Sequence, residues 1–420
     1  MCFARIRTAA FLLALSTVAA AWAEPEEDLV VVGGTGESCL EDPDCFNRLH
    51  PRIPMAARAR PGQTILFHTR DAGDSLGTVA SQGPERPVLR SGGSRAHAVT
   101  GPVYIEGARA GDVLKVTILG IEPGRWGWTR AGGGGYVGDL VEGGLTVVWR
   151  LNRDFAESDE LPGVRIPNAS FPGLVTTLPG PVQLQRMLAR ERALADAGGR
   201  VLLPEPVDAS PAPLCGPDGS AAEECLRTIP PREHGGNLDI RYLQTGVAVY
   251  LPCFLDGCGL AIGDLHYAQG DGEVSGTAIE MSADVRVQVE VLQDGPDLAR
   301  GPHYEGSAEL LSIPSRRFYA VTGFPLKEVG TIPPNLAYLD SPKLAALENL
   351  SGDIGLAARN AVAGIVDHIV ATYGYSRPQA YAIASVAVDV RIAQLVDAPN
   401  FGVTALLPLD IFVDAENAAP

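Results

Sequence analysis

The chain has 420 residues, of which 46% are apolar, so it can bury a large core and lacks the composition of a disordered protein. Its formal charge of −17 at pH 7 argues against a nucleic-acid partner and against binding to anionic membranes, because both require basic patches. The 48 glycines and 33 prolines predict short strands joined by many turns. This length fits either two or three average domains or one large β-rich unit.

Residues 1–23 have the pattern of a secretory leader. Arg5 and Arg7 precede an apolar run from Ala9 to Ala21, and the tripeptide that ends at Ala23 fits a cleavage site. The run is too short for a membrane-spanning helix with ordinary flanks. Loss of the leader would change the formal charge from −17 to −19. We therefore predict a periplasmic or secreted protein that has no membrane contact after leader removal.

Six cysteines follow the leader and form three local pairs in the sequence. An even number of cysteines in an oxidising compartment predicts disulfides, whereas a zinc cluster would require a C-x₂-C spacing that is absent from the sequence. Asp256-Gly257 adds a hairpin-turn signal inside the third pair. The predicted bonds are Cys39–Cys45, Cys215–Cys225 and Cys253–Cys258.

The first half of the chain reads as strands after a short extension. Residues 24–46 are predicted to be an N-terminal extension, and strands are expected within 63–69, 103–105, 113–118 and 147–149. Four consecutive glycines, Gly132–Gly135, indicate either a flexible surface loop or a lid. A helix is expected over 183–197, followed by a loop-rich insertion over 204–226.

The second half adds strands and the main helices. Strands are expected within 238–251, 257–281 and 285–292, and helices over 356–373 and from Ser376 towards Ser385. The predicted fold class is therefore α+β and β-rich, with mixed sheets in a sandwich or barrel-like core and two to three helices late in the chain. We expect the strand-rich halves on either side of the insertion to pack into one unit and to share one site.

The stretch from Gly257 to Met281 carries the clearest chemical pattern. Side chains alternate between faces of a strand, so Asp264 and His266 point the same way. A carboxylate beside an imidazole can hold a divalent metal or transfer a proton, although a satisfied structural pair at a strand end is the alternative. Glycines 270 and 272 indicate a turn that would bring Glu273 back towards the same pocket.

Several blocks of this sequence resemble the acetamidase/formamidase family, which comprises metal-associated hydrolases of short linear amides. The resemblance is carried by NRLHPRIP (47–54), TGPVYIEGARAGDVL (100–114), RTIPPREHGGNLDIR (227–241), GDLHYAQGDGEVSGTAIEM (263–281) and DVRIAQLVDAPNFGVTALLP (389–408), in the family's order. The leader, the cysteine-bearing insertion and the cysteine pair before residue 263 depart from the family pattern. The resemblance implies a catalytic unit over residues 47–415.

Other hydrolytic chemistries find no support in the sequence. It contains no G-x-S-x-G elbow and no H-E-x-x-H motif, and its paired cysteines would be blocked as nucleophiles. A hydrolase of this sequence must therefore activate water, and a divalent metal can lower the pKa of a bound water to near ~7. The expected cofactor is a divalent metal, zinc in the first place, with calcium as an alternative structural ion.

The candidate residues come from both halves of the chain. Predicted roles are metal ligation by Asp264 and His266, and proton transfer by Glu273 or Glu280; Glu280 could instead be a structural acid. Backbone N–H groups of Gly235 and Gly236 could stabilise an oxyanion, or the two glycines could form a plain turn. Third ligands could be His97, Asp71 or His50, each with a hydrogen-bonded structural role as the alternative; substrate contacts are assigned to His234, Asn237, Asp239 and Gln269.

The function predicted first is an exported, metal-dependent hydrolase that converts a short linear amide, such as formamide or acetamide, to a carboxylate and ammonia. Its partner would be the small-molecule amide, with a homo-oligomer as a further possibility. One alternative is an exported binding or structural protein on the same scaffold. Another is a hydrolase of a different small C–N bond, such as that of a lactam.

Overall fold

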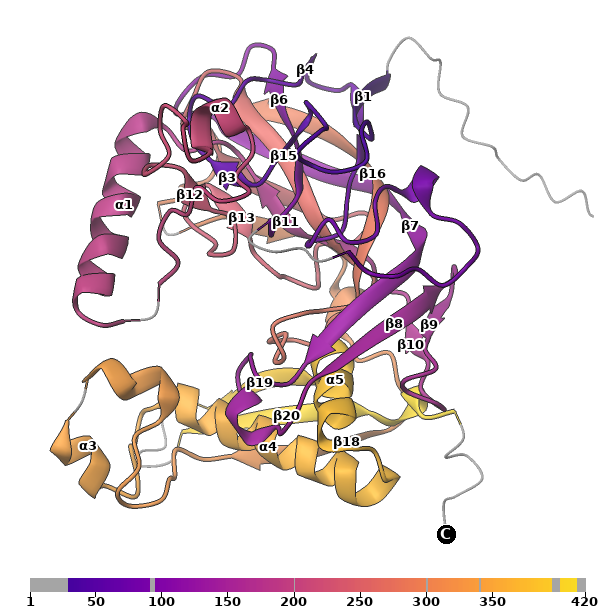
Figure 1. Cartoon of the computed structure of the whole chain (residues 1–420), viewed down its shortest axis with the longest axis vertical. Helices are drawn as coiled ribbons and strands as arrows, with labels where there is room; N and C mark the ends of the chain where they lie inside the picture. The colour runs from indigo at the N-terminus through magenta and orange to yellow at the C-terminus, as the bar shows by residue number, and fades with distance from the viewer. Residues whose placement is uncertain are drawn as a thin grey trace, which may run out of the picture.

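The computed structural model describes residues 29–90, 95–199, 201–299, 301–339, 341–394 and 401–413. The predicted leader lies outside the described residues, and so does the end of the predicted catalytic unit beyond residue 413. Figure 1 shows a large β-structure above a smaller part that contains α3, α4, α5 and the last three strands. The β-rich fold with several sheets and helices late in the chain confirms the predicted fold class.

Fifteen strands form the main sheet, with a central order of β10-β9-β8-β7-β16-β15-β11-β13. Most neighbours are antiparallel, but β1 with β5 and β4 with β6 are parallel, so the sheet is mixed as predicted. The strands are β1 (Leu29–Gly33), β2 (Cys45–Phe46), β4 (Ala57–Ala59), β5 (Thr64–His68), β6 (Val99–Ile105), β7 (Val113–Ala131), β8 (Leu145–Leu151), β9 (Phe155–Glu157), β10 (Ile166–Pro167), β11 (Phe171–Thr176), β13 (Gly235–Asn237), β14 (Ala248–Pro252), β15 (Cys258–His266), β16 (Glu280–Leu292) and β17 (His303–Glu305).

The remaining elements surround this sheet or form the C-terminal part. Two short strands, β3 (Arg48–Leu49) and β12 (Leu226–Arg227), pair with each other, and the third sheet has the order β18-β20-β19. Its strands are β18 (Phe318–Gly323), β19 (Asp389–Gln394) and β20 (Gly402–Pro408). The helices are α1 (Pro181–Asp196), α2 (Ala212–Cys215), α3 (Pro342–Ala346), α4 (Ile354–Tyr373) and α5 (Arg377–Ala387), with 3₁₀ turns η2 (Val79–Ser81), η3 (Gly138–Leu140), η4 (Ala308–Leu311), η5 (Pro334–Leu339) and η6 (Leu409–Ile411).

The expected N-terminal extension is built into the main sheet. β1 pairs in parallel with β5 along its whole length, and β2 pairs with β6. The sequence of β1, LVVVG, is rich in β-branched residues, which favour strands. The predicted disulfide Cys39–Cys45 closes the loop between these two strands. Residues 29–46 therefore belong to the sheet rather than lying beside it.

The 204–226 segment packs with α1 in a second apolar core. Its predicted disulfide, Cys215–Cys225, is formed, and both cysteines are buried there together with Leu184 and Leu188 of α1. The helix begins with Pro181 at its first position, where a proline costs no hydrogen bond. The third predicted disulfide, Cys253–Cys258, joins the end of β14 to the start of β15.

Capping residues explain where the two long C-terminal helices begin and end. The Asp353 side chain accepts a hydrogen bond from Leu356 N–H at the start of α4, and Gly374 ends that helix with φ of 74°. Ser376 and Gln379 form a capping box at the start of α5. α4 is long and apolar enough to span a bilayer by length and composition alone, yet it packs against β18 and β20 in the manner of a core helix.

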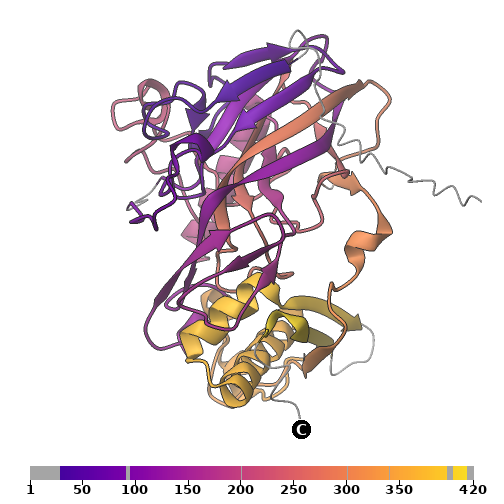
Figure 2. The same cartoon turned by 90° about the vertical axis from the view of Figure 1, so that its right-hand side faces the viewer.

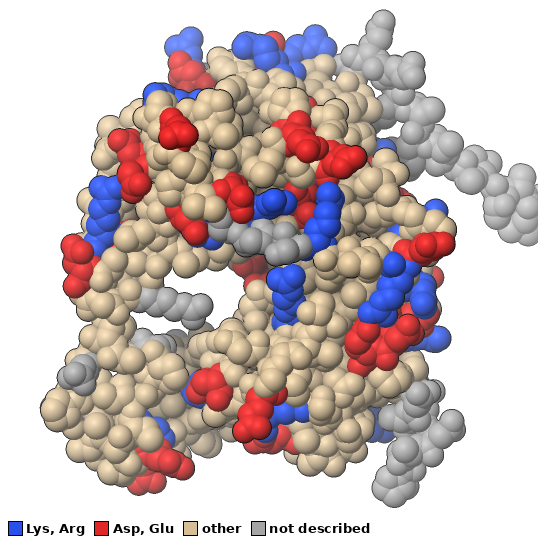
Figure 3. Space-filling model, viewed as in Figure 1, with Lys and Arg blue, Asp and Glu red and all other residues tan. Residues whose placement is uncertain are grey.

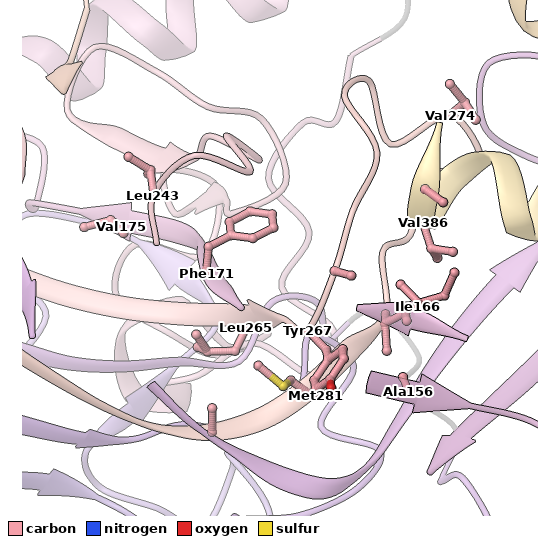
Figure 4. Packing of buried hydrophobic residues seen from close by; sticks show 14 of the residues in the cluster. Ala156, Ile166, Phe171, Val175, Leu243, Leu265, Tyr267, Val274, Met281 and Val386 are labelled. Carbon is pink, nitrogen blue, oxygen red and sulfur yellow. The ribbon is translucent and has the colours of Figure 1, made fainter. Parts of the chain in front are cut away.

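A continuous apolar core joins the two parts of the molecule. Residues of the main sheet and residues of α4, α5 and β20 belong to the same buried cluster. Figure 4 shows this core from close by, with Ile166 of β10 beside Val386 of α5. In Figure 2, β7 and β8 run down from the main sheet to the C-terminal part, where both contact α5. The space-filling view shows a notch on one face between the regions that bear α1 and α3 (Figure 3).

Two sequence expectations need correction. Within 238–251 only residues 248–251 form a strand, β14; residues 238–247 make turns. The apolar run 274–279 is a loop, whose residues Val274, Ala278 and Ile279 are nevertheless buried. A short apolar run cannot by itself distinguish a buried loop from a strand.

Candidate active site

Asp264 and His266 lie at the end of β15, the central strand of the sheet, and Glu280 is the first residue of β16. The register of β15 and β16 places Glu280 directly opposite His266. The His266 Nε2 atom lies 3.4 Å from Asp264 Oδ1 and 3.2 Å from Glu280 Oε2. All three residues are buried, with exposed fractions of 2%, 0% and 3% respectively. The alternation predicted for Asp264 and His266 therefore brings both into one site.

Asp239 and Glu273 form a second acidic group around the same histidine. Potential ligand atoms of Asp239, His266 and Glu273 all lie within 4.8 Å of one another. Asp239 follows β13 and its backbone N–H donates to the Gly173 carbonyl of β11, at 3.1 Å. Glu273 comes from the loop between β15 and β16. Four carboxylates consequently converge on His266, from β15, β16, the segment after β13 and the loop between β15 and β16.

Three of these four acids have a backbone conformation that is unusual for a residue with a side chain. The φ angles are 49° for Asp239, 52° for Asp264 and 41° for Glu273. Side chains in this left-handed region cost free energy, of order ~1–3 kcal/mol each, and such residues concentrate at functional sites. The surrounding fold therefore holds these carboxylates in place against local preference, which indicates a function for the cluster.

Gln269 fixes the orientation and tautomer of the His266 ring. Its Nε2 donates to the Asp239 carbonyl at 2.8 Å, so its Oε1 must be the atom that faces His266 Nδ1, also at 2.8 Å. An amide oxygen can only accept, and Nδ1 therefore carries a proton. Nε2 is then the atom directed at Asp264 and Glu280, as in metal-binding histidines, and although burial alone would lower the pKa of His266, the charges of Glu280 and Asp264 raise it.

The four carboxylates lie close together with few positively charged groups nearby, and this arrangement shifts their pKa values. Burial raises the pKa of Glu280 to about 7, although His266 opposes this shift, and burial together with the charge of Asp264 raises the pKa of Asp239 to about 8. Burial, and then the charge of Asp239, hold the pKa of Glu273 well above its usual value. Burial alone would raise the pKa of Asp264, but the neighbouring His97 and His266 bring it far below its ordinary range. The cluster is strongly acidic and attracts either protons or a cation.

The atoms that face one another in this cluster lack hydrogen-bond partners among the described residues. Asp264 Oδ1, His266 Nε2 and Glu280 Oε2 are all buried without a hydrogen bond in the described chain, although Nε2 lies within ion-pair distance of both carboxylate oxygens. Buried charges without partners are costly, and such groups usually coordinate a metal or pair with a counter-charge. One imidazole nitrogen with two carboxylate oxygens is a donor set that suits zinc, with room for an open position. The residues present therefore fit a divalent cation.

His97, one of the three candidates for a third metal ligand, lies at the edge of the cluster. Its Nε2 lies 3.8 Å from the second carboxylate oxygen of Asp264, and its backbone N–H donates to Thr228 Oγ1 at 2.6 Å. Burial lowers the pKa of His97, although the charge of Asp264 opposes this shift, and a lower pKa favours the neutral ring that can bind a cation. Its Nδ1 is buried without a partner among the described residues.

The structure does not bring Asp71 or His50 into either acidic group of the described chain. The Asp71 carboxylate accepts from the N–H groups of Ser75 and Leu76 and from Trp128 Nε1, so it closes a local turn. His50 Nδ1 accepts from the N–H of Arg52 two residues later. The Asp71 carboxylate and His50 Nδ1 are thus engaged in turns, while His50 Nε2 lies 4.0 Å from Glu224 Oε2.

Gly235 and Gly236, which were predicted to stabilise an oxyanion, have a structural role in the backbone. The N–H of Gly235 donates to the Arg232 carbonyl at 3.0 Å, and a Cβ at Gly235 would lie 2.4 Å from the Val175 carbonyl oxygen. Its φ is 98°, as is that of Gly236, and both pair with β11. These glycines therefore permit a close β11–β13 contact, and Gly235 has no free N–H to offer a ligand.

Of the predicted substrate contacts, three lie at the cluster and one does not. Asn237 Nδ2 donates to Asp239 Oδ2 at 2.8 Å, while Gln269 holds His266 as described above. His234 instead faces Thr176, whose Oγ1 lies 2.7 Å from its Nδ1. Burial lowers the pKa of His234 to about 3, and the charges that act on it come from Arg232 and Glu233, not from the cluster.

Sequence reasoning missed Gly173, which forms one wall of the site. A Cβ at this position would lie 2.8 Å from both Asp239 Oδ1 and His266 Cε1, and 2.9 Å from the Asp264 carbonyl oxygen. Gly173 follows Phe171, whose ring packs edge-on against His266 at 5.1 Å. The only sequence signal here was a Pro-Gly pair, which normally indicates a turn.

A cavity of about 180 Å³ borders the cluster at Gln269. Its apolar walls include Ile166 from the main sheet, Val386 from α5 and Ile411 from η6, so both parts of the molecule contribute. The cavity also reaches Arg241 and Asp389, which form an ion pair.

Comparisons with known proteins identify the family and agree with the fold. Residues 35–414 match the sequence model of the Acetamidase/Formamidase family. The chain is 30% identical over 399 residues to a formamidase of Methylophilus methylotrophus, covering 89% of this chain and 90% of the relative. It is 30% identical over 363 residues to an acetamidase of Mycolicibacterium smegmatis, covering 80% and 84% respectively. Among solved structures, a gamma lactamase from Delftia acidovorans is similar, with a TM-score of 0.75 and 30% identity over 89% of this chain and 91% of that one.

Proposed function

The chain belongs to the Acetamidase/Formamidase family, and from this premise we propose that it is a metal-dependent hydrolase of short linear amides. One observation carries the metal dependence: three buried atoms, Asp264 Oδ1, His266 Nε2 and Glu280 Oε2, face one another without hydrogen-bond partners in the described chain. Small-amide substrates are supported by the family, whose named relatives are a formamidase and an acetamidase.

Asp264, His266 and Glu280 would hold the cation, because each offers one unpaired ligand atom and Gln269 has already engaged the other nitrogen of His266. A divalent metal such as zinc supplies Lewis acidity, which polarises the amide carbonyl and lowers the pKa of water. Its positive charge would also offset the charge of the two carboxylates.

Glu273 is our candidate for the proton-transfer residue. It is less buried than Glu280 and lies within reach of His266 and Asp239. Its carboxylate accepts a proton from the attacking water while the water oxygen bonds to the amide carbon. It then donates that proton to nitrogen, the C–N bond breaks with its electron pair on nitrogen, and ammonia leaves. One carboxyl can perform both transfers.

Asp239 would orient the amide. Its Oδ2 is occupied by Asn237, whereas its Oδ1 is buried without a partner in the described chain and lies beside the space that Gly173 leaves open. An acceptor in this position suits the N–H of a primary amide.

A cyclic amide is the second candidate substrate. It is favoured by the similarity in fold and sequence to the gamma lactamase from Delftia acidovorans. Hydrolysis of a lactam breaks the same C–N bond and would need the same residues, but the amine stays attached to the product. Measuring ammonia therefore separates the two substrate classes.

We also propose that the protein is exported. The leader pattern of residues 1–23 and the three disulfides of the described chain support an oxidising compartment. Cell fractionation and sequencing of the mature N-terminus test this proposal, and a mature chain that begins at Met1 in the cytoplasm would contradict it.

The decisive experiment combines metal analysis with product detection. The purified protein is analysed for bound metal and incubated with formamide, acetamide and a γ-lactam, with ammonia and ring opening measured separately. Chelation should abolish turnover and readdition of zinc should restore it. His266→Ala should lose both metal and activity, because it removes the one imidazole ligand. Full metal content together with full turnover in this variant would place the site elsewhere.

A further inference from the structure

Glu273 lies on the loop from Tyr267 to Ile279, which joins β15 to β16 without regular structure of its own. A carboxyl on a loop needs external support if it is to reach a buried site reproducibly. The contacts of this loop show where that support comes from. They lead to the C-terminal part, and above all to α5 and β19.

The arm of the loop that precedes Glu273 is fixed by two segments of the C-terminal part. The N–H of Gly270 donates to the Ser385 carbonyl at 2.9 Å. The N–H of Asp271 donates to Asp389 Oδ1 at 3.3 Å, and the Asp271 carbonyl accepts from Val390 N–H at 3.1 Å. Asp389 is itself buried and bonded to two arginines, Arg241 and Arg391.

The arm that follows Glu273 returns to the same serine. The N–H of Ser275 donates to Ser385 Oγ at 3.0 Å, and this hydroxyl donates to the Thr277 carbonyl at 2.7 Å. The Tyr381 hydroxyl, one turn earlier on α5, donates to the Val274 carbonyl. Ser385 thus bonds both arms, through its carbonyl on one side and its hydroxyl on the other, with Glu273 between them.

Close approaches show how tightly the loop is seated. A Cβ at Gly270 would lie 2.1 Å from the Val388 carbonyl oxygen, which only a glycine avoids. On the opposite side, a Cβ at Gly135 would lie 2.5 Å from both the Tyr381 hydroxyl and the Val274 carbonyl. The tetraglycine segment therefore ends in contact with both this loop and Tyr381 of α5.

We propose that Ser385 is a positioning residue: it fixes both arms of the 267–279 loop so that Glu273 reaches the cluster, which makes the C-terminal part a component of the active site. This inference rests on the proposed role of Glu273. Ser385 acts only through the loop, since its described polar contacts are with loop backbone and with its own helix.

The test replaces Ser385 by alanine, which removes the hydroxyl and leaves its backbone carbonyl in place. We expect kcat to fall by about 10–100-fold, the range seen for residues that orient catalytic groups, with bound metal unchanged and a smaller effect on KM. The same substitution made in a Glu273→Gln background should have almost no further effect on kcat, because a misplaced Glu273 no longer matters. An equal loss of kcat in both backgrounds would overturn the proposal.

Thr69 offers a matched control outside the site. Its hydroxyl is also fully buried, donates to a backbone carbonyl (Ala283, 2.7 Å) and accepts from a backbone N–H (Ala283, 3.2 Å). Thr69→Val removes an equivalent pair of bonds in the main sheet. It should lower stability to a similar extent but leave kcat within about twofold, so a general loss of stability cannot mimic the effect of Ser385→Ala.

Hydrogen exchange gives a readout that does not depend on turnover. The Ser275 amide should exchange faster in Ser385→Ala, because its acceptor is gone, while amides at the centre of β15 stay protected. Unchanged exchange at Ser275 would show that Ser385 does not hold the loop. Full activity of Glu273→Gln would instead refute the proposed proton-transfer role of Glu273. Hydrogen exchange at Ser275 would then still decide whether Ser385 holds the loop. Asp389→Asn, which weakens the first arm, provides a second variant if Ser385→Ala does not fold.

Discussion

Around His266, the fold places four carboxylates in a space that is largely closed to water. The four fall into two pairs, because Asp264 and Glu280 lie on the paired strands β15 and β16 and face Nε2 directly, whereas Asp239 and Glu273 lie on loops. This difference supports separate tasks for the two pairs, one for holding a cation and one for handling the amide and its protons.

Glu273→Gln is expected to separate these tasks. The amide keeps the size of the side chain but cannot accept a proton from water. Bound metal should stay at the wild-type level, while kcat should fall by about 10²–10⁴-fold, the usual contribution of a general acid–base residue. Metal analysis and steady-state kinetics on the same preparation decide the outcome. If Glu273→Gln loses its metal instead, Glu273 is a ligand and the assignment of the two pairs must be exchanged.

Gly173→Ala tests the geometry of the cluster without removing any polar group. Its added Cβ would lie 2.8 Å from Asp239 Oδ1 and from His266 Cε1, so at least one of them must shift. We expect metal affinity and kcat/KM to fall by at least about 10-fold, with the fold retained. Gly120→Ala in β7 is the matched control, because no described heavy atom lies within 4 Å of its added Cβ. Wild-type kinetics for Gly173→Ala would show that the space beside it is not used.

A site residue could be identified from the sequence when the pattern that indicates it lies in the neighbouring residues of the chain. Asp264 and His266 were predictable because strand alternation is a local rule, and Glu280 because it follows an apolar run. Gly173 was not, since its role depends on a side chain that is missing and on partners that lie far away in the sequence. Asp71 and His50 were expected as ligands because sequence alone does not reveal the turn contacts that already engage the Asp71 carboxylate and His50 Nδ1.

At the level of elements, the register of β16 determines much of the site. This strand pairs with β5, β7 and β15, so one residue of slip would move Glu280 away from His266 and reverse the buried face of the strand. The helix ends of α4 and α5 were predictable because their caps are local. The loop over 274–279 was not, because it is buried by α5, which comes a hundred residues later.

The β5–β16 pair also carries a titratable contact away from the site. His68 Nδ1 lies 2.7 Å from Asp284 Oδ1 on the opposite strand, and this hydrogen bond raises the pKa of His68, against burial and the nearby Arg286. A pKa that is higher in the folded state means that the pair stabilises the protein fully below the unfolded value of about 6.5. This contribution is lost as the pH rises through the folded pKa.

Asp284→Asn should therefore reduce the free energy of unfolding more at pH 5.5 than at pH 8. Because both side chains are partly exposed, the pH-dependent difference should be below about 1 kcal/mol. Denaturant unfolding of wild type and variant at the two pH values measures it. A difference that grows towards pH 8 would have the wrong sign for a protonated His68 and would contradict this account.

At the scale of the whole molecule, the two parts depend on each other. The main sheet supplies Asp264, His266 and Glu280, whereas the C-terminal part holds the loop that carries Glu273. The expectation of one unit that shares a site rested on the occurrence of motif residues in both halves of the chain. What sequence could not indicate was that the C-terminal block would act through α5 and β19 on a loop that precedes it by about a hundred residues.

The three disulfides allow a prediction about the stability of the molecule as a whole. The bonded cysteines are 6, 10 and 5 residues apart. In the chain-entropy model, a loop of this length restricts the unfolded chain by about 2–3 kcal/mol, so each bond should stabilise the folded state modestly. Reduction should consequently lower the denaturation midpoint without abolishing folding, because the large apolar core remains.

The measurement compares thermal unfolding with and without a reductant in the wild type and in a variant whose six mature cysteines are serine. The wild type should lose stability on reduction, whereas the variant should begin at the lower midpoint and not respond. Pairwise serine variants then apportion the loss, and the ten-residue loop of Cys215–Cys225 should account for slightly more than either shorter loop, because loop entropy grows with the logarithm of length. A wild type whose midpoint ignores the reductant, with six free thiols by mass spectrometry, would remove the disulfides and with them the main support for an oxidising compartment.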